Sequence, residues 1–188
     1  MLVTVLGPDG TGKTTLAKAL AKNINGLNYI YFGYNKEIRN YKYFDVFMKS
    51  EPRNLFNRLV RKGLRFFNDI AIFNFSKQSN VISDRCPIDS FVNTKIQKRA
   101  LKYYYYITLK FSPNPDFVIL LEGDSKILYN RKKEISEHHI RKAIIYYKQY
   151  LKKNRISHIL IDTTKNDIND TYKIAMNALR KNFDERKN

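Results

Sequence analysis

The stretch Gly7-Pro8-Asp9-Gly10-Thr11-Gly12-Lys13-Thr14 decides the fold of this chain, because it fits the pattern G-x-x-x-x-G-K-T without a mismatch. An apolar run at residues 2–6 precedes it and predicts a strand, and an Ala-, Leu- and Lys-rich run at residues 13–22 follows it and predicts a helix. The glycines let backbone N–H groups turn toward phosphate oxygens, and the helix N-terminus adds partial positive charge. The stretch therefore predicts a loop that binds the phosphates of ATP.

Two side chains of this loop have separate roles in the predicted site. Lys13 should reach the β- and γ-phosphates, and the Thr14 hydroxyl should ligate Mg²⁺. A glycine-rich turn that binds nothing is the alternative, and the complete pattern in its expected context makes it much the weaker one.

Outward from the loop, short apolar runs alternate with longer helical stretches, which is typical of a parallel sheet covered by helices. Strands are expected at residues 2–6, 28–32, 80–83, 117–121 and 156–161. Helices are expected at residues 13–22, 36–78 with a break at Pro52, 90–111, 125–133, 137–153 and 168–181. We predict one α/β domain over residues 1–188, a three-layer P-loop NTPase fold with a five-stranded parallel sheet.

Asp84 and Arg85 directly follow the third predicted strand, and ligands of parallel sheets bind beyond the carboxyl ends of strands. A carboxylate there faces the phosphate site and can hold a metal-bound water. An arginine there can hold an acceptor phosphate with two parallel hydrogen bonds. A surface ion pair that ends the strand is the weaker alternative. Cys86 is expected to be a small buried apolar residue.

A basic cluster, Arg131-Lys132-Lys133, lies between two predicted helices, with Arg141 further on. Cations that close on a migrating phosphoryl group stabilise its charge, although a solvated helix face explains the cluster equally well on composition alone. The four tyrosines at residues 103–106 favour packing on a helix over stacking on nucleic acid. The three histidines have no metal-ligand spacing.

The balance of 35 Lys+Arg against 17 Asp+Glu gives a net charge of +18. Compositional bias, steering of an anionic substrate, and binding of nucleic acid or a membrane surface are the three explanations. The charge forms no basic tail, which weakens the third. The apolar runs are too short to span a bilayer, no signal peptide is expected, and the single cysteine suits a reducing, cytoplasmic location.

Together these residues resemble the thymidylate kinase family of nucleoside monophosphate kinases. Residues 7–15 are similar to its G-x-D-G-x-G-K-T-T loop, and Asp84-Arg85 is similar to its Asp-Arg-Tyr motif. Residues 115–121 resemble the Pro-Asp step before its fourth strand, and residues 161–164 resemble the Ile-Asp-Ala segment under the adenine. The resemblance spans nearly the whole chain and is most specific at the loop.

The resemblance implies ATP and Mg²⁺ as cofactors and transfer of the γ-phosphoryl group to a nucleoside monophosphate, most simply dTMP. Catalytic roles are implied for Lys13, Asp84, Arg85 and Arg131, and Mg²⁺ ligation for Thr14 and Asp84. ATP binding is implied for Gly7, Asp9, Gly10, Thr11, Gly12, Lys13, Thr14, Thr15, Arg131, Thr163 and Thr164. Acceptor binding is implied for Asp9, Arg85 and Asp89, with Arg131 in a helical lid at about residues 125–142.

The chain also departs from the family pattern. Cys86 replaces the tyrosine of Asp-Arg-Tyr, Asp89 stands where a serine is usual, and no Phe-Pro-x-Arg segment follows the second strand. Gly10 stands where some members carry a catalytic arginine; members without it use lid cations, which residues 131–133 fit. A branch of thymidylate-kinase-like proteins met beside surface-polysaccharide genes is similar at Asp84-Arg85-x-x-x-Asp89 and at residues 131–136.

Two alternatives therefore stay open. The first is a P-loop kinase for another small acceptor, such as a nucleoside or a sugar or polysaccharide precursor, with Asp84 or Asp89 as the base. The second is a nucleic-acid-binding ATPase, which the net charge suggests. The expected partners are ATP and a small phosphorylated acceptor. A homodimer is compatible with the sequence, nucleic acid is not favoured, and no membrane partner is expected.

Overall fold

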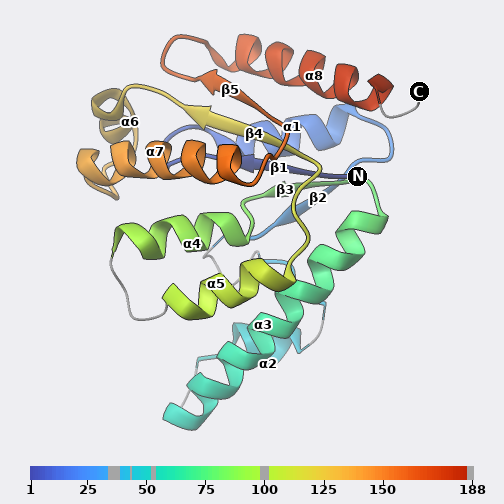
Figure 1. Cartoon of the computed structure of the whole chain (residues 1–188), viewed down its shortest axis with the longest axis vertical. Coiled ribbons are helices and arrows are strands. Elements are labelled where there is room, and N and C mark those ends of the chain that lie inside the picture. The colour runs from blue at the N-terminus through green and yellow to red at the C-terminus, as the bar shows by residue number, and fades with distance from the viewer. Residues whose placement is uncertain (34–38, 43, 52–53, 98–101, 186–188) are drawn as a thin grey trace.

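The computed structural model describes residues 1–33, 39–42, 44–51, 54–97 and 102–185 (Figure 1). Within these residues one sheet of five parallel strands has the order β2-β3-β1-β4-β5. The strands are β1 (Leu2–Leu6), β2 (Asn28–Tyr31), β3 (Val81–Asp84), β4 (Phe117–Glu122) and β5 (His158–Asp162). The helices are α1 (Lys13–Asn23), α2 (Asp45–Lys49), α3 (Leu55–Gln78), α4 (Pro87–Ile96), α5 (Lys102–Phe111), α6 (Ser125–Arg131), α7 (Glu137–Lys153) and α8 (Ile168–Glu185).

Helices cover both faces of the sheet, so the domain has three layers (Figure 1). In β1, Leu2 and Leu6 pack against the layer that contains α3, α4 and α7, whereas Val3 and Val5 pack against α1 and α8. Because successive side chains of a strand point to opposite faces, an apolar run such as β1 suits a strand buried on both sides. The predicted α/β fold with five parallel strands is confirmed.

Some boundaries differ from those predicted. The helix expected at residues 90–111 is two helices, and α4 already begins at Pro87, since proline suits the first helical position. The stretch expected as a helix at residues 36–78 contains the short α2 and the long α3. The expected break at Pro52 lies outside the described residues. None of the described helices is long and apolar enough to cross a membrane.

The register of the sheet places the carboxyl ends of its strands side by side. Val5 of β1 lies opposite Asp84 of β3, and Leu6 lies opposite Leu120 of β4. At the far side of β4, Glu122 lies opposite Asp162 of β5. The segments that follow β1, β3, β4 and β5 therefore meet at one edge, and the predicted site residues come from these segments.

Candidate functional site

The loop after β1 approaches the neighbouring backbone closely at Gly7. The φ angle of Gly7 is 145°, and a Cβ atom there would lie 2.3 Å from the carbonyl oxygen of Leu121. Gly12 also has a positive φ, of 81°, but a Cβ atom there would have nothing within 4 Å. Glycine is thus required at Gly7 for both space and backbone conformation, and at Gly12 for backbone conformation alone.

The two glycines provide a matched pair for testing the loop. We expect Gly12→Ala to cost about 1–2 kcal/mol of stability through its backbone conformation. Gly7→Ala should cost about 1–3 kcal/mol more, because the new methyl group displaces the loop or the end of β4. Each 1 kcal/mol lowers the Tm of a chain of this size by about 2–4 °C. Thermal unfolding of both variants measures the difference, and equal Tm values would contradict the loop geometry.

Lys13 turns its ammonium group back into the loop. Its side chain is 5% exposed, and Nζ donates to the carbonyl oxygen of Pro8 at 2.7 Å and to Asp9 Oδ1 at 3.5 Å. Burial lowers the pKa of Lys13, the nearby Arg85 lowers it as well, and carboxylates around it oppose the shift, so that the pKa is about 8. The ammonium group is therefore poorly solvated in this site, so an arriving anionic phosphate would stabilise it.

Asp84 and Thr14 meet at the entrance of α1. Thr14 Oγ1 donates to Asp84 Oδ2 at 2.5 Å, and the Tyr29 hydroxyl donates to the same oxygen at 3.4 Å. The other oxygen, Oδ1, is buried without a hydrogen-bond partner in the described structure. Mg²⁺ prefers oxygen ligands and is usually held by one or two protein groups together with substrate phosphates and waters. The Thr14 and Asp84 oxygens fit that role.

The described residues contain no group of three or more His, Cys, Asp or Glu side chains that could hold a metal on their own. A metal at Thr14 and Asp84 would thus depend on phosphate oxygens. We expect Asp84→Asn to raise the Mg²⁺ concentration needed for tight binding of a fluorescent ATP analogue, on the order of 10–100-fold. Tyr29→Phe, which removes only the longer hydrogen bond, is the control and should leave this concentration unchanged. An equal shift in both variants would contradict metal ligation by Asp84.

Arg85 lies across the loop from Lys13, and its backbone is in the left-handed region, which residues other than glycine adopt only infrequently. Its φ is 72°, and its side chain is 15% exposed. Nη2 donates to Asp9 Oδ1 at 2.6 Å, and Nη1 donates to Asp89 Oδ2 at 3.1 Å. Burial lowers the pKa of Arg85, but Asp89 and Asp9 outweigh it and raise the pKa above its usual range. Left-handed backbone at a charged residue beside a phosphate loop is typical of functional sites.

Asp89 lies behind Arg85 and is almost fully buried. Its Oδ2 also accepts from Asn93 Nδ2 at 3.2 Å, and its Oδ1 accepts from the Tyr147 hydroxyl. Asn93 Oδ1 in turn lies 3.0 Å from His139 Nε2. Both carboxylate oxygens are thus engaged, and the network joins α4 to α7. The sequence offered only one signal for it, since Asn93 follows Asp89 by one helical turn.

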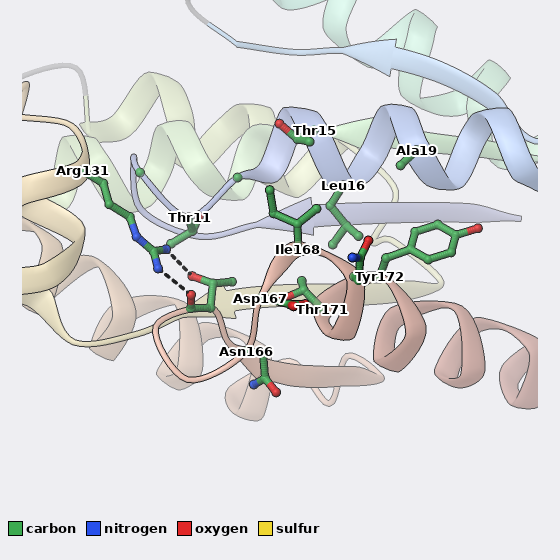
Figure 2. A pocket seen from close by; sticks show the side chains of 14 residues that line it. Thr11, Thr15, Leu16, Ala19, Arg131, Asn166, Asp167, Ile168, Thr171 and Tyr172 are labelled. Carbon is green, nitrogen blue, oxygen red and sulfur yellow. Dashed lines mark hydrogen bonds between the residues drawn. The ribbon is translucent and has the colours of Figure 1, made fainter.

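Arg131, at the end of α6, reaches the segment after β5. Its Nη2 donates to the carbonyl oxygen of Thr163 at 2.8 Å, and its Nη1 donates to Thr163 Oγ1 at 3.4 Å (Figure 2). Lys132 pairs with Glu134 at 3.1 Å, and Lys133 is exposed. The three residues of the predicted basic cluster therefore have different surroundings, and only Arg131 faces the predicted ATP site.

A cavity of about 590 Å³ lies beside the loop, between α1 and α8 (Figure 2). The predicted residues that line it are Gly10, Thr11, Gly12, Thr15, Arg131 and Thr163. The residues that sequence reasoning missed are Leu16, Ala19, Asn166, Asp167, Ile168, Asn169, Thr171 and Tyr172. Thr164 does not line it, because its hydroxyl donates to Asp162 Oδ1 at 2.6 Å and accepts from the Asp124 amide at 3.1 Å.

The predicted site residues thus form one continuous arrangement. Lys13, Thr14 and Asp84 gather at the loop, Arg85 faces them with Asp9 between, and Arg131 lies at the mouth of the cavity. The roles of these residues stay predictions.

Comparisons with known proteins agree with this fold. The profile of the ATPase family associated with various cellular activities (AAA) matches residues 3–70, which is well under half of the chain and includes the loop. No curated protein sequence matches the chain.

Three solved structures illustrate the likeness. Deoxyadenosine kinase from M. mycoides, with the products dCMP and dCDP, is 20% identical with a TM-score of 0.63, over 96% of this chain and 100% of that one. Thymidylate kinase from Candida albicans is 15% identical with a TM-score of 0.70, over 96% and 91%. Thymidylate kinase from Ehrlichia chaffeensis is 19% identical with a TM-score of 0.60, over 96% and 98%. At these identities the likeness establishes the fold alone.

Proposed function

We propose that this chain transfers the γ-phosphoryl group of ATP to the phosphate of a nucleoside monophosphate, most simply dTMP. The observation that carries the proposal is the opposition of two cationic groups across the loop: Lys13 inside it, and Arg85 facing it with Asp9 between them. The first suits the donor phosphates and the second suits an acceptor phosphate. The kinases of similar fold support this class of reaction.

The donor half of the site suits ATP. The cavity between α1 and α8, of about 590 Å³, is within the size range of small-molecule sites and has room for the adenosine, with Leu16 and Ile168 on its walls. The triphosphate would then run into the loop toward Lys13. Arg131 adds a cation at the point where the cavity meets the loop.

The acceptor half favours a phosphate over a hydroxyl. A hydroxyl acceptor needs a free base. Of the two candidate bases, Asp89 has its carboxylate oxygens engaged by Arg85, Asn93 and Tyr147, and Asp84 is the proposed partner of Mg²⁺ together with Thr14. Asp89 therefore suits a positioning role, in which it aims the Arg85 guanidinium. An acceptor phosphate needs no strong base, because it is already a nucleophile.

In this reaction the protein supplies position and charge. Lys13 and Arg131 would stabilise the negative charge that spreads over the migrating group, and Arg85 would hold the acceptor in line with it. Mg²⁺ at Thr14 and Asp84 would neutralise charge on the β- and γ-phosphates. Arg85 uses only two of its five N–H donors on Asp9 and Asp89, so others can bind the acceptor phosphate. The Asp9 contact, which faces the loop, is the one we expect the phosphate to displace.

A nucleoside acceptor is the second candidate. The free Oδ1 oxygen of Asp84 favours it, because that oxygen can accept a proton from a hydroxyl group. The M. mycoides deoxyadenosine kinase, which has a similar fold, is named for a nucleoside acceptor. A sugar or polysaccharide precursor remains a third acceptor to test.

A coupled assay of ADP release, with Mg²⁺ and ATP, tests the proposal across nucleoside monophosphates, nucleosides and sugars. We expect turnover with one or more nucleoside monophosphates well above the rate with water alone. Turnover only with nucleosides would favour the second candidate. Turnover with none of these acceptors, stimulated instead by single-stranded DNA, would favour a nucleic-acid-binding ATPase.

A further inference from the structure

A second cavity, of about 550 Å³, is lined by residues of α4, α5 and α7 and of the segment after α5. These three helices lie on the same side of the sheet (Figure 1). None of the residues that line this second cavity lines the cavity beside the loop. The reaction proposed above makes no use of it. We refer to it as the side groove.

The walls of the side groove are aromatic. The rings of Phe91 and Tyr150 pack with centroids 5.9 Å apart, and Tyr146 and Tyr106 complete the walls. Tyr106 is 59% exposed, so it is accessible to a ligand. Stacking on exposed aromatic rings is a sequence-tolerant way to bind a nucleobase, because every base has a flat π-face.

The rim of the side groove is cationic. Lys95, Lys110 and Lys153 line it, and no Asp or Glu residue does. Lys95 Nζ lies 4.2 Å from the centroid of the Tyr146 ring, and none of the three lysines has an ion pair with a described carboxylate. Three lysines without carboxylate partners create a positive potential that attracts an anion.

The side groove also holds an unsatisfied polar atom. Ser112 Oγ is buried and has no hydrogen-bond partner within the described structure. A buried hydroxyl without a partner is unfavourable. Asn114 and Gln149 add further donors and acceptors on the same lining.

We propose that the side groove binds a nucleoside phosphate, with its base against the tyrosine rings and its phosphate at the lysines. The volume is within the range of small-molecule sites. This site is separate from the proposed reaction and does not depend on it. The same chemistry has two sources, a free nucleotide or one nucleotide unit of a single-stranded nucleic acid.

Photocrosslinking with two matched probes tests the proposal. The first probe is free 4-thiothymidine monophosphate, and the second is a single-stranded oligothymidylate that carries one 4-thiothymidine. Peptide mass spectrometry then identifies the attachment points. We expect crosslinks within residues 91–95, 106–114 and 146–154, in addition to any at the loop. Groove crosslinks with the first probe indicate a free nucleotide, and groove crosslinks confined to the second indicate a nucleic acid strand.

Charge-matched variants separate the groove from the overall net charge. Changing Lys95, Lys110 and Lys153 to glutamine should reduce the groove crosslinks about tenfold or more, since one charged hydrogen bond alone is worth that much. Changing the exposed Lys22, Lys77 and Lys152 to glutamine removes the same charge outside the groove and should leave the number of groove crosslinks unchanged. A comparison of the single variants Lys153→Gln, in the groove, and Lys152→Gln, at the neighbouring position outside it, repeats this test with one charge removed from each. Equal crosslinking in the matched variants, or no groove crosslinks with either probe, would overturn the proposal.

Discussion

Lys13→Ala should lower the rate of phosphoryl transfer by about 10²–10³-fold, the usual loss when one preorganised donor to a transition-state charge is removed. Lys13 is buried in the loop, where its ammonium group donates to the carbonyl oxygen of Pro8 and, in the proposed reaction, would bind the donor phosphates. No other described lysine lies in that loop, and Arg85 is held by Asp9 and Asp89. Arg85 therefore cannot replace the lost charge at the β- and γ-phosphates.

The same substitution should leave the fold intact. Burial of the Lys13 ammonium group disfavours its charged form, as its pKa of about 8 reflects, so its removal relieves a desolvation cost. Steady-state kinetics and thermal unfolding of Lys13→Ala measure the two effects separately. Lys22→Ala, at the exposed end of the same helix, is the control. Unchanged kinetics in Lys13→Ala would contradict the assignment of the loop.

Arg85→Lys should raise the KM of the acceptor by about 10- to 150-fold and leave the KM of ATP nearly unchanged. The guanidinium of Arg85 spans two carboxylates and offers a planar fork to a phosphate, whereas a lysine offers a single point charge. The loss of one charge-assisted contact, worth about 1.5–3 kcal/mol, sets the expected range.

Both Michaelis constants must be measured to interpret this variant. Arg180→Lys, at an exposed position near the end of α8 and outside the cavity lining, is a control in which the same exchange should have no kinetic effect. An effect on kcat or stability alone would favour an unphosphorylated acceptor. A loss confined to ATP binding would show that Arg85 belongs to the donor half of the site.

The fold was largely predictable because its signals are local. The spacing of glycines and Lys13 identifies the loop, and the uniformly apolar run of β1 identifies a strand buried on both faces. Parallel strands connected by helices then bring the ends of β1 and β3 to one edge, which is why Asp84 could be assigned to the site from sequence.

The remaining parts depend on contacts between distant segments, for which the sequence has no local signal. Tyr147 reaches Asp89 across 58 positions of the chain, and Thr163 meets Arg131 across 32. The cavity wall on α8 was missed because its helical pattern predicts packing and does not reveal which residues face an open space. The left-handed backbone of Arg85 likewise has no signal in its residue type, because arginine has no preference for that conformation.

The most direct test of the central claim is ³¹P NMR of the product formed from ATP and dTMP in the presence of Mg²⁺. The account predicts that the phosphomonoester resonance of dTMP is replaced by the phosphoanhydride resonances of a nucleoside diphosphate, in addition to those of the ADP formed, and that this replacement is lost when Lys13→Ala replaces the native chain. It would be contradicted if dTMP and the other nucleoside monophosphates stayed unchanged while a parallel reaction of ATP with a nucleoside or a sugar gave a new phosphate ester.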